Sequence, residues 1–403
     1  MTFDPKDASH RESEMRGDAG TVRIRDGLPF CLAIFLCARI LLSLLGVVGV
    51  DDASPDTDTE GVSLSGAEVP ATPGWHNALD GTNRFDAAWF IAISEDGYSA
   101  DDESAAFFPG FPLAIRAASW MLPGDTLVGA LAVSNALFLV GLVVLYALTA
   151  MEFDEGRARR TIALVAFFPS SLFFLAPYSE SFFLAAVVLT FWWSRRDKPV
   201  FAGLAGFVAV GVKSVGFVVV PALLVEAAVR SESRRELARR LAYGLLPLLA
   251  LAAYGAFWLG RTRDALEPLA AQDAWTRSLQ FPVITIGEAI SLGAQGITDA
   301  RGIWWTLDLV VTAALLIPFL HRFRELRLSY QVFVGLSLLI PLTFPFPPRP
   351  FMSMPRFVIV LFPMFWSLAG ELSNLRAFIA VLIVSIAGYS VLAISFMNWG
   401  PVF

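Results

Sequence analysis

The sequence predicts an all-α protein that crosses a membrane many times. Of its 403 residues, 56% are hydrophobic, 13% are aromatic and only 16% are charged, and the mean hydropathy is +0.62. Soluble domains usually contain more charge and less apolar surface. A membrane-spanning helix needs about 20 apolar residues, and apolar runs near this length recur between clusters of basic residues.

We expect about 11 transmembrane segments, within a range of 9–13. The apolar runs are 28–50, 127–150, 161–176, 179–193, 200–212, 215–229, 241–259, 303–320, 330–346, 357–371 and 376–397. Several are too short for a full span and contain Gly or Pro. The sequence therefore predicts tight hairpins or broken helices within 161–193 and 200–229.

The basic residues predict the orientation, because Lys and Arg in short loops stay on the cytoplasmic side. With the N-terminus inside, 20 of them fall on the cytoplasmic side and 8 on the outer side. We expect a disordered cytoplasmic tail at 1–27, a membrane domain at 28–397 and an outer tail at 398–403. A cell membrane of prokaryotic type is favoured by the short chain and its acidic outer loop.

This topology places two long loops outside, 51–126 and 260–302, and a short proline-rich loop at 345–356. The acidic, Ser- and Pro-rich stretch 51–74 predicts a flexible excursion. Aromatic and apolar residues then alternate with acids over 85–98 at a spacing near that of a helix. That pattern predicts an amphipathic helix in the membrane interface.

No metal and no cofactor are expected. Cys31 and Cys37 both fall in the first apolar run and are interpreted as buried thiols. The three histidines are scattered over the chain, without the spacing of metal ligands. The acidic pair Asp56 and Asp58 has the spacing of a metal-binding D-x-D motif, but its position in a solvated acidic loop favours a structural interpretation.

Three charged residues have a chemical and a structural interpretation. Asp86 lies among aromatics at the start of the expected interfacial helix, where a carboxylate can accept a proton or simply cap the helix. Glu180 follows a short hairpin and is either a site residue or a packing partner. Lys213 stands in an apolar stretch, so it either faces a cavity or an anion or extends to the interface.

The run that begins at Arg84 reads R-F-D-A-A-W-F-I-A-I-S-E-D-G-Y and is followed by A-F-F-P-G-F-P-L. It resembles the first luminal loop of the PIG-V family, the second mannosyltransferase of GPI-anchor assembly, and its prokaryotic relatives. The resemblance continues through 168–171, 178–180, 213–216 and 353–357. Phe85 and Val215 depart from the family pattern, which usually has Trp and Asn there.

The resemblance implies a GT-C type glycosyltransferase fold and a polyprenyl- or dolichyl-phosphate sugar donor, with Asp86 as the catalytic carboxylate. A phosphate leaving group calls for cations, and Lys213, Arg349 and Arg356 are the candidates on the outer side. We also expect substrate contacts from Arg84, Trp89, Tyr98, Phe108, Tyr178, Glu180 and Ser214.

The expected activity is inverting transfer of a hexose, with mannose favoured by the resemblance, to a lipid-linked or glycan acceptor. Membrane lipids are the other expected partners, and no nucleic acid is expected. Two alternatives stay open. A secondary transporter would explain the helix count and Lys213, although no paired halves are found in the sequence. A noncatalytic envelope-assembly protein is the other alternative.

Overall fold

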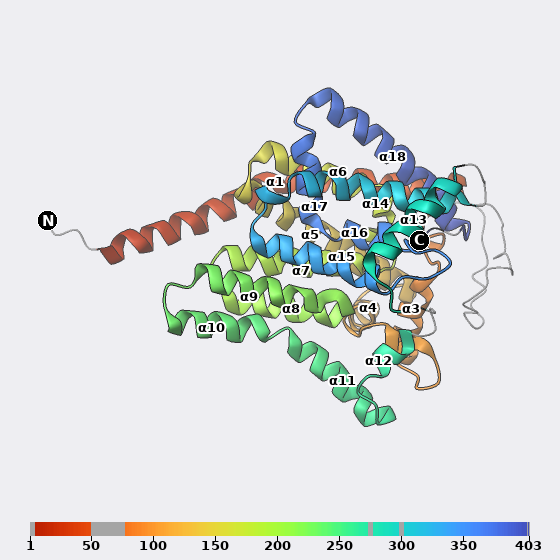
Figure 1. Ribbon diagram of the computed structural model, residues 1–403, viewed down its shortest axis with the longest axis horizontal. Coiled ribbons are helices and arrows are strands. Elements are labelled where there is room, and N and C mark those ends of the chain that lie inside the picture. The colour runs from red at the N-terminus through yellow and green to blue at the C-terminus, as the bar shows by residue number, and fades with distance from the viewer. Residues whose placement is uncertain (1–4, 50–76, 273–276, 298–301, 401, 403) are drawn as a thin grey trace.

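The computed structural model is an all-α bundle (Figure 1). It describes residues 5–49, 77–272, 277–297, 302–400 and 402. Within these ranges the regular elements are all helices, as the sequence predicts. The acidic stretch 51–74, with Asp56 and Asp58, lies outside the described residues.

Long helices run side by side along the bundle, and shorter ones gather at its ends. The α-helices are α1 (Pro5–Gly49), α2 (Asn77–Asp80), α3 (Asp86–Asp96), α4 (Gly110–Met121), α5 (Thr126–Glu152), α6 (Glu155–Phe167), α7 (Glu180–Arg195), α8 (Pro199–Val212), α9 (Val219–Arg230), α10 (Arg234–Leu245), α11 (Leu248–Thr262), α12 (Glu267–Ala270), α13 (Pro282–Gln295), α14 (Ile303–His321), α15 (Leu328–Thr343), α16 (Met354–Ile359), α17 (Phe362–Glu371) and α18 (Leu375–Met397). Short 3-10 helices include η2 (Ser171–Phe174) and η3 (Ser214–Val218).

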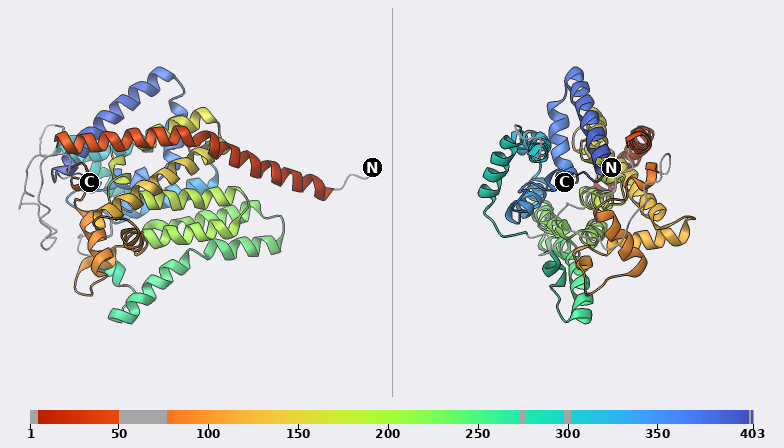
Figure 2. Two further views of the ribbon diagram at one scale, coloured as in Figure 1. Left: turned by 180° about the vertical axis from the view of Figure 1, so that it is seen from behind. Right: turned by 90° about the vertical axis from the view of Figure 1, so that its right-hand side faces the viewer.

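The core is centred on α5 and α7, which pack against each other, while α1 covers α5 and α8 covers α7. Aromatic side chains fill the interior, and Phe138, Phe183 and Trp366 have no exposed surface. Figure 2 shows the bundle from behind and along its length. This interior is dense enough to hold charged helix ends in fixed positions.

Five helical segments within the described residues are long and apolar enough to cross a membrane. They are Arg25–Gly49, Thr126–Glu152, Arg234–Thr262, Ile303–His321 and Leu375–Met397. Two shorter apolar helices are α8 and α15. The protein is therefore built as an integral membrane protein, whereas the count of about 11 spans stays a prediction because the other apolar segments form shorter helices.

The predicted breaks within 161–193 and 200–229 are confirmed. Helix α6 ends at Phe167, because Phe168 precedes Pro169 and takes an extended conformation, with ψ 147°. Lys213 is likewise extended, with φ −151° and ψ 136°, and separates α8 from η3. Each break ends a helix inside the protein and leaves polar residues next to that helix end.

Helix α3 confirms that a helix follows Arg84, but its apolar side packs into the protein. Phe90 and Ile93 are buried against Phe107 and Phe111. The tail at 1–27 also differs from the expected disorder, because α1 starts at Pro5. Proline is tolerated in a first helical turn, and no other proline occurs before Pro29.

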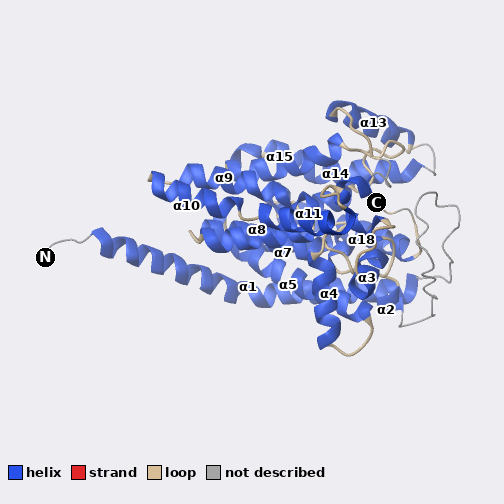
Figure 3. Ribbon diagram, turned by 90° about the horizontal axis from the view of Figure 1, so that it is seen from below, coloured by secondary structure: helices blue, strands red, loops and turns tan. Residues whose placement is uncertain are grey.

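Helices α2, α3 and α13 and the C-terminus lie at the end of the bundle away from the N-terminus (Figures 1 and 3). Helices α9 and α10 meet at the other end, where the chain turns through 231–233. The described parts of the expected outer loops 51–126 and 260–302 thus share one end of the bundle with the C-terminus. That this side faces outward is a prediction.

Cysteine labelling tests this orientation. Asp101 is exposed in the segment between α3 and α4, and Glu232 is exposed in the turn between α9 and α10. Helix α3 and the turn between α9 and α10 lie at opposite ends of the bundle (Figure 3). In a variant without Cys31 and Cys37, a membrane-impermeant maleimide should label Asp101→Cys in intact cells and Glu232→Cys only after permeabilisation. The reverse pattern would overturn the orientation inferred from the basic residues.

Candidate functional site

Four charged side chains from distant parts of the chain meet at the end of the bundle that carries α3. We call Asp86, Glu180, Lys213 and Arg356 the charge network. The Arg356 NH1 atom lies 2.6 Å from Asp86 Oδ2. Lys213 Nζ lies 2.6 Å from Glu180 Oε1, and Arg356 Nε lies 3.3 Å from the same oxygen. Glu180 therefore links the two cations.

Three of the four members of the network stand at favourable helix ends. Asp86 is the first residue of α3 and Glu180 is the first residue of α7. Lys213 follows the last residue of α8. Carboxylates near helix N-termini and cations near C-termini are stabilised by the helix dipole. The helix breaks thus supply part of the electrostatics of the site.

The network is buried unevenly. The exposed fraction of the side chain is 1% for Glu180, 15% for Arg356, 17% for Lys213 and 27% for Asp86. Burying a charge costs free energy unless the charge is paired. The ion pairs of the network provide this pairing. Asp86 is the most accessible member, and it is therefore the carboxylate that a substrate reaches most easily.

The two cations respond differently to burial beside the carboxylates. Burial acts to lower the pKa of Arg356, but the carboxylates of Asp86 and Glu180 outweigh it and hold that pKa above its usual value. Burial lowers the pKa of Lys213, and the carboxylate of Glu180 opposes that shift. Glu180 Oε2 is buried and accepts no hydrogen bond from the described residues. The network thus has an unused acceptor beside two cations.

Asp86 does not act as a simple helix cap. The residue before α3 is Phe85, whose side chain makes no capping hydrogen bond, and the Asp86 carboxylate is directed to Arg356. Tyr178 holds the backbone directly before α3, since its hydroxyl donates to the backbone oxygen of Arg84 at 2.9 Å. Arg84 is 3% exposed and donates to the backbone oxygens of Met397 and Asp80. Its guanidinium holds the backbone in place.

Arg277 joins the site, although the sequence analysis did not select it. The centre of the Phe357 ring lies 5.7 Å from both Lys213 Nζ and Arg356 Cζ and 5.8 Å from Arg277 Cζ, so three cations lie close to one aromatic ring. Burial and the charge of Arg356 lower the pKa of Arg277 to about 10, which leaves it protonated at neutral pH. Nothing in its sequence context distinguishes it from the other arginines of 260–302.

Arg349 lies in a different ion pair. Its Nε and NH2 atoms lie 2.5 and 2.9 Å from the two carboxylate oxygens of Asp308 in α14. Asp308 has no exposed surface. This two-point contact ties the proline-rich loop to the bundle, and Arg349 as a phosphate ligand stays a prediction.

The other predicted contact residues make different contacts within the fold. Trp89 stacks on Phe107 with ring centres 5.5 Å apart. The Tyr98 hydroxyl donates to the Phe107 oxygen at 2.7 Å. Phe108 packs on Tyr254, and Ser214 is exposed at the start of η3. Their contact with a substrate is untested.

No group of three or more His, Cys, Asp or Glu side chains that could hold a metal ion occurs in the part of the chain that the structure describes. The charge network offers one accessible carboxylate beside cations. Such a site can accept a proton and bind an anion.

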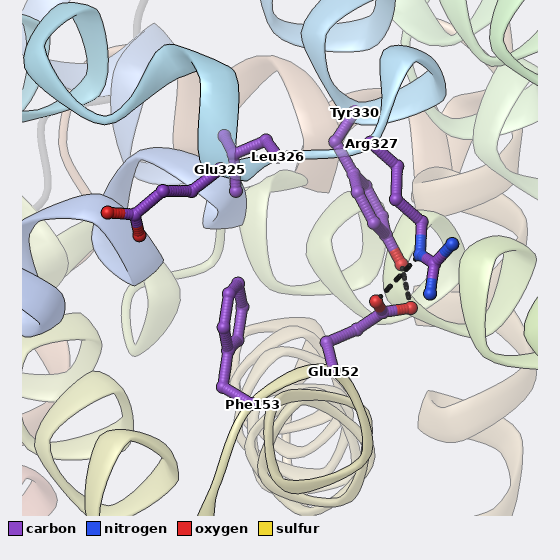
Figure 4. Close-up of a pocket in the computed structure, with 6 residues that line it drawn as sticks. All are labelled: Glu152, Phe153, Glu325, Leu326, Arg327 and Tyr330. Atoms are coloured by element: carbon purple, nitrogen blue, oxygen red, sulfur yellow. Dashed lines mark hydrogen bonds and ion pairs between the residues drawn. The ribbon is translucent and has the colours of Figure 1, made fainter.

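A cavity of about 270 Å³ lies elsewhere in the bundle (Figure 4). It is lined by Glu152, Phe153, Glu325, Leu326, Arg327 and Tyr330. Arg327 and Tyr330 both donate to the Glu152 carboxylate, and Arg195 pairs with it from the far end of α7. Since α7 has 16 residues, the cavity and Glu180 are roughly 20 Å apart.

Comparison with known proteins places the chain in a family. A family model described as mannosyltransferase (PIG-V) matches residues 32–246, a range that includes Asp86, Glu180 and Lys213. GPI alpha-1,6-mannosyltransferase 2 of Rattus norvegicus is 33% identical over 156 residues, covering 36% of this chain and 32% of the relative. GPI mannosyltransferase 2 of Drosophila pseudoobscura pseudoobscura is 27% identical over 169 residues, covering 38% and 37%.

The matched region thus spans about a third of the length of these curated relatives. Among solved structures, the archaeal oligosaccharyltransferase AglB from Archaeoglobus fulgidus, in complex with an inhibitory peptide and a dolichol-phosphate, has a TM-score of 0.45 at 13% identity. That similarity covers 92% of this chain and 56% of the archaeal one. Because the family model covers more than half of the sequence, the chain belongs to the PIG-V mannosyltransferase family.

Proposed function

We propose that this protein is a membrane mannosyltransferase that transfers the sugar from a polyprenyl- or dolichyl-phosphate donor to a lipid-linked or glycan acceptor. The observation that carries the proposal is the 2.6 Å contact between Asp86 and Arg356. It joins an accessible carboxylate to a cation within a member of a mannosyltransferase family. The reaction requires a group that accepts the proton of the acceptor hydroxyl and a group that stabilises the leaving phosphate. The carboxylate meets the first requirement and the cation meets the second.

The acceptor hydroxyl attacks the anomeric carbon of the donor while the bond between that carbon and the phosphate oxygen breaks. Asp86 takes the hydroxyl proton, and the lipid phosphate leaves with the electron pair of the broken bond. A direct displacement of this kind inverts the anomeric carbon. The leaving group is already a stable anion, so base catalysis and cationic stabilisation suffice.

The cations that receive the phosphate are Arg356, Lys213 and Arg277. Each of them lies within 5.8 Å of the centre of the Phe357 ring. Arg356 also pairs with Asp86, so a bound phosphate competes with Asp86 for this guanidinium. We therefore propose that the donor binds first and releases the carboxylate for proton transfer. The free oxygen of Glu180 then accepts a hydrogen bond from a sugar hydroxyl.

The site is proposed to face the outer side of a prokaryotic cell membrane, with the N-terminus in the cytoplasm. The basic-residue bias supports this side. A polyprenyl-phosphate donor is suited to the outer side of the membrane, because the sugar is attached to a membrane lipid and no soluble nucleotide sugar is needed there. A secondary transporter would instead move a tracer into vesicles without sugar transfer.

Replacing Asp86 tests the proposed base. Asn has nearly the same shape but cannot take a proton, so Asp86→Asn should lower kcat by about 10²–10⁴-fold while leaving folding intact. Transfer of labelled mannose from a polyprenyl-phosphate donor to endogenous lipid acceptors by purified protein measures this. Glu95→Gln and Asp96→Asn are matched controls, since both residues are exposed on the same helix. Wild-type turnover by Asp86→Asn would refute the assignment.

Replacing the cations tests donor binding. Arg356→Lys keeps the charge but loses the planar fork, so it should retain more activity than Arg356→Ala. Arg277→Ala should lower kcat/KM for the donor by about 10- to 100-fold, the effect of losing one hydrogen bond to a charged group. Arg116→Ala is the control, because Arg116 is an exposed arginine on α4. Equal kcat/KM for Arg277→Ala and Arg116→Ala would remove Arg277 from the site.

A further inference from the structure

The backbone immediately before Asp86 has an unusual conformation. Phe85 has φ 53° and ψ −124°. A positive φ is uncommon for residues other than glycine, and a bulky residue keeps it only when surrounding contacts impose it. Asp86 is the next residue, so the contacts that hold Phe85 also determine where the Asp86 carboxylate lies.

The turn at the end of α18, residues 396–399, supplies those contacts. The Phe85 ring lies against Phe396, with ring centres 5.6 Å apart, and meets the Trp399 ring edge-on at 5.3 Å. The Arg84 guanidinium lies over the same Trp399 ring at 5.0 Å, and Arg84 Nε donates to the Met397 oxygen at 2.9 Å. Both residues that precede Asp86 are thus held by one turn.

This turn is itself anchored. Asn398 Nδ2 donates to the backbone oxygen of Gly49, the last residue of α1, at 2.6 Å. On the opposite side, the Tyr178 hydroxyl donates to the Arg84 oxygen. Figures 1 and 3 show that α18 ends at the same end of the bundle as α3. The turn connects α1, α18 and the start of α3.

We propose that Trp399 is a positioning residue for Asp86. It holds Phe85 in the left-handed region, and this directs the following carboxylate toward Arg356. The proposal rests on the proposed role of Asp86 as the base. The cations near Phe357 belong to other elements, and a displaced Asp86 competes less with the phosphate for Arg356. Loss of the Trp399 ring should therefore disturb proton transfer without weakening donor binding.

The prediction is a separation of kcat from KM. Trp399→Ala should lower kcat by about 10- to 100-fold, because a displacement of about 1 Å at a catalytic group can cost 10²-fold. The KM for the donor should change little. Trp399→Phe keeps an aromatic ring against Phe85 and should restore most of kcat. Trp120→Ala is the control, since Trp120 is 85% exposed and should behave as wild type.

Amide hydrogen exchange of the full-length protein gives a readout that does not depend on activity. In Trp399→Ala, exchange should increase across 80–90 and stay unchanged in α7, and Trp399→Phe should restore protection. Wild-type kcat in Trp399→Ala, or exchange that increases equally in both regions, would overturn the proposal. Absence of transfer by the wild type would refute the proposed function instead, and the exchange result would still decide whether Trp399 holds the turn.

Discussion

The ion pair between Asp86 and Arg356 is the interaction on which the site depends. The two residues are separated by 270 positions in the sequence, and their contact closes the network that also includes Glu180 and Lys213. Glu180 is almost fully buried, so its charge is tolerable only because two cations share its carboxylate. Removing either cation would leave a buried charge undercompensated.

The helical architecture serves this network by ending helices where charge is needed. Helices α3 and α7 begin at acids, and α8 ends beside a lysine. A continuous helix through Lys213 would satisfy its backbone hydrogen bonds. It would not bring the charged end of α8 next to the first residues of α3 and α7. The short helices that reduce the number of clear membrane spans are therefore the same features that build the site.

The sequence predicts which residues form the charge network better than it predicts which of them pair with each other. Asp86, Glu180 and Lys213 are identifiable because a charge in an apolar or aromatic setting is costly and needs a reason. Their pairing depends on tertiary distances that no local pattern contains. The same limit explains why the sequence favours Arg349 over Arg277 as a phosphate ligand: both are arginines between helices, and only the fold places Asp308 beside one and Phe357 beside the other. The positive φ of Phe85 is also imposed by a distant turn, so its local sequence does not predict it.

We propose that the cations beside Asp86 hold the donor phosphate. The most direct measurement is an experimental structure of the protein with a polyprenyl monophosphate bound. We expect the phosphate oxygens at about 2.7–3.2 Å from the guanidinium of Arg356, with Lys213 and Arg277 around them and the Asp86 carboxylate released from Arg356. A phosphate bound in the cavity beside Glu152, with the pair between Asp86 and Arg356 intact, would contradict the account.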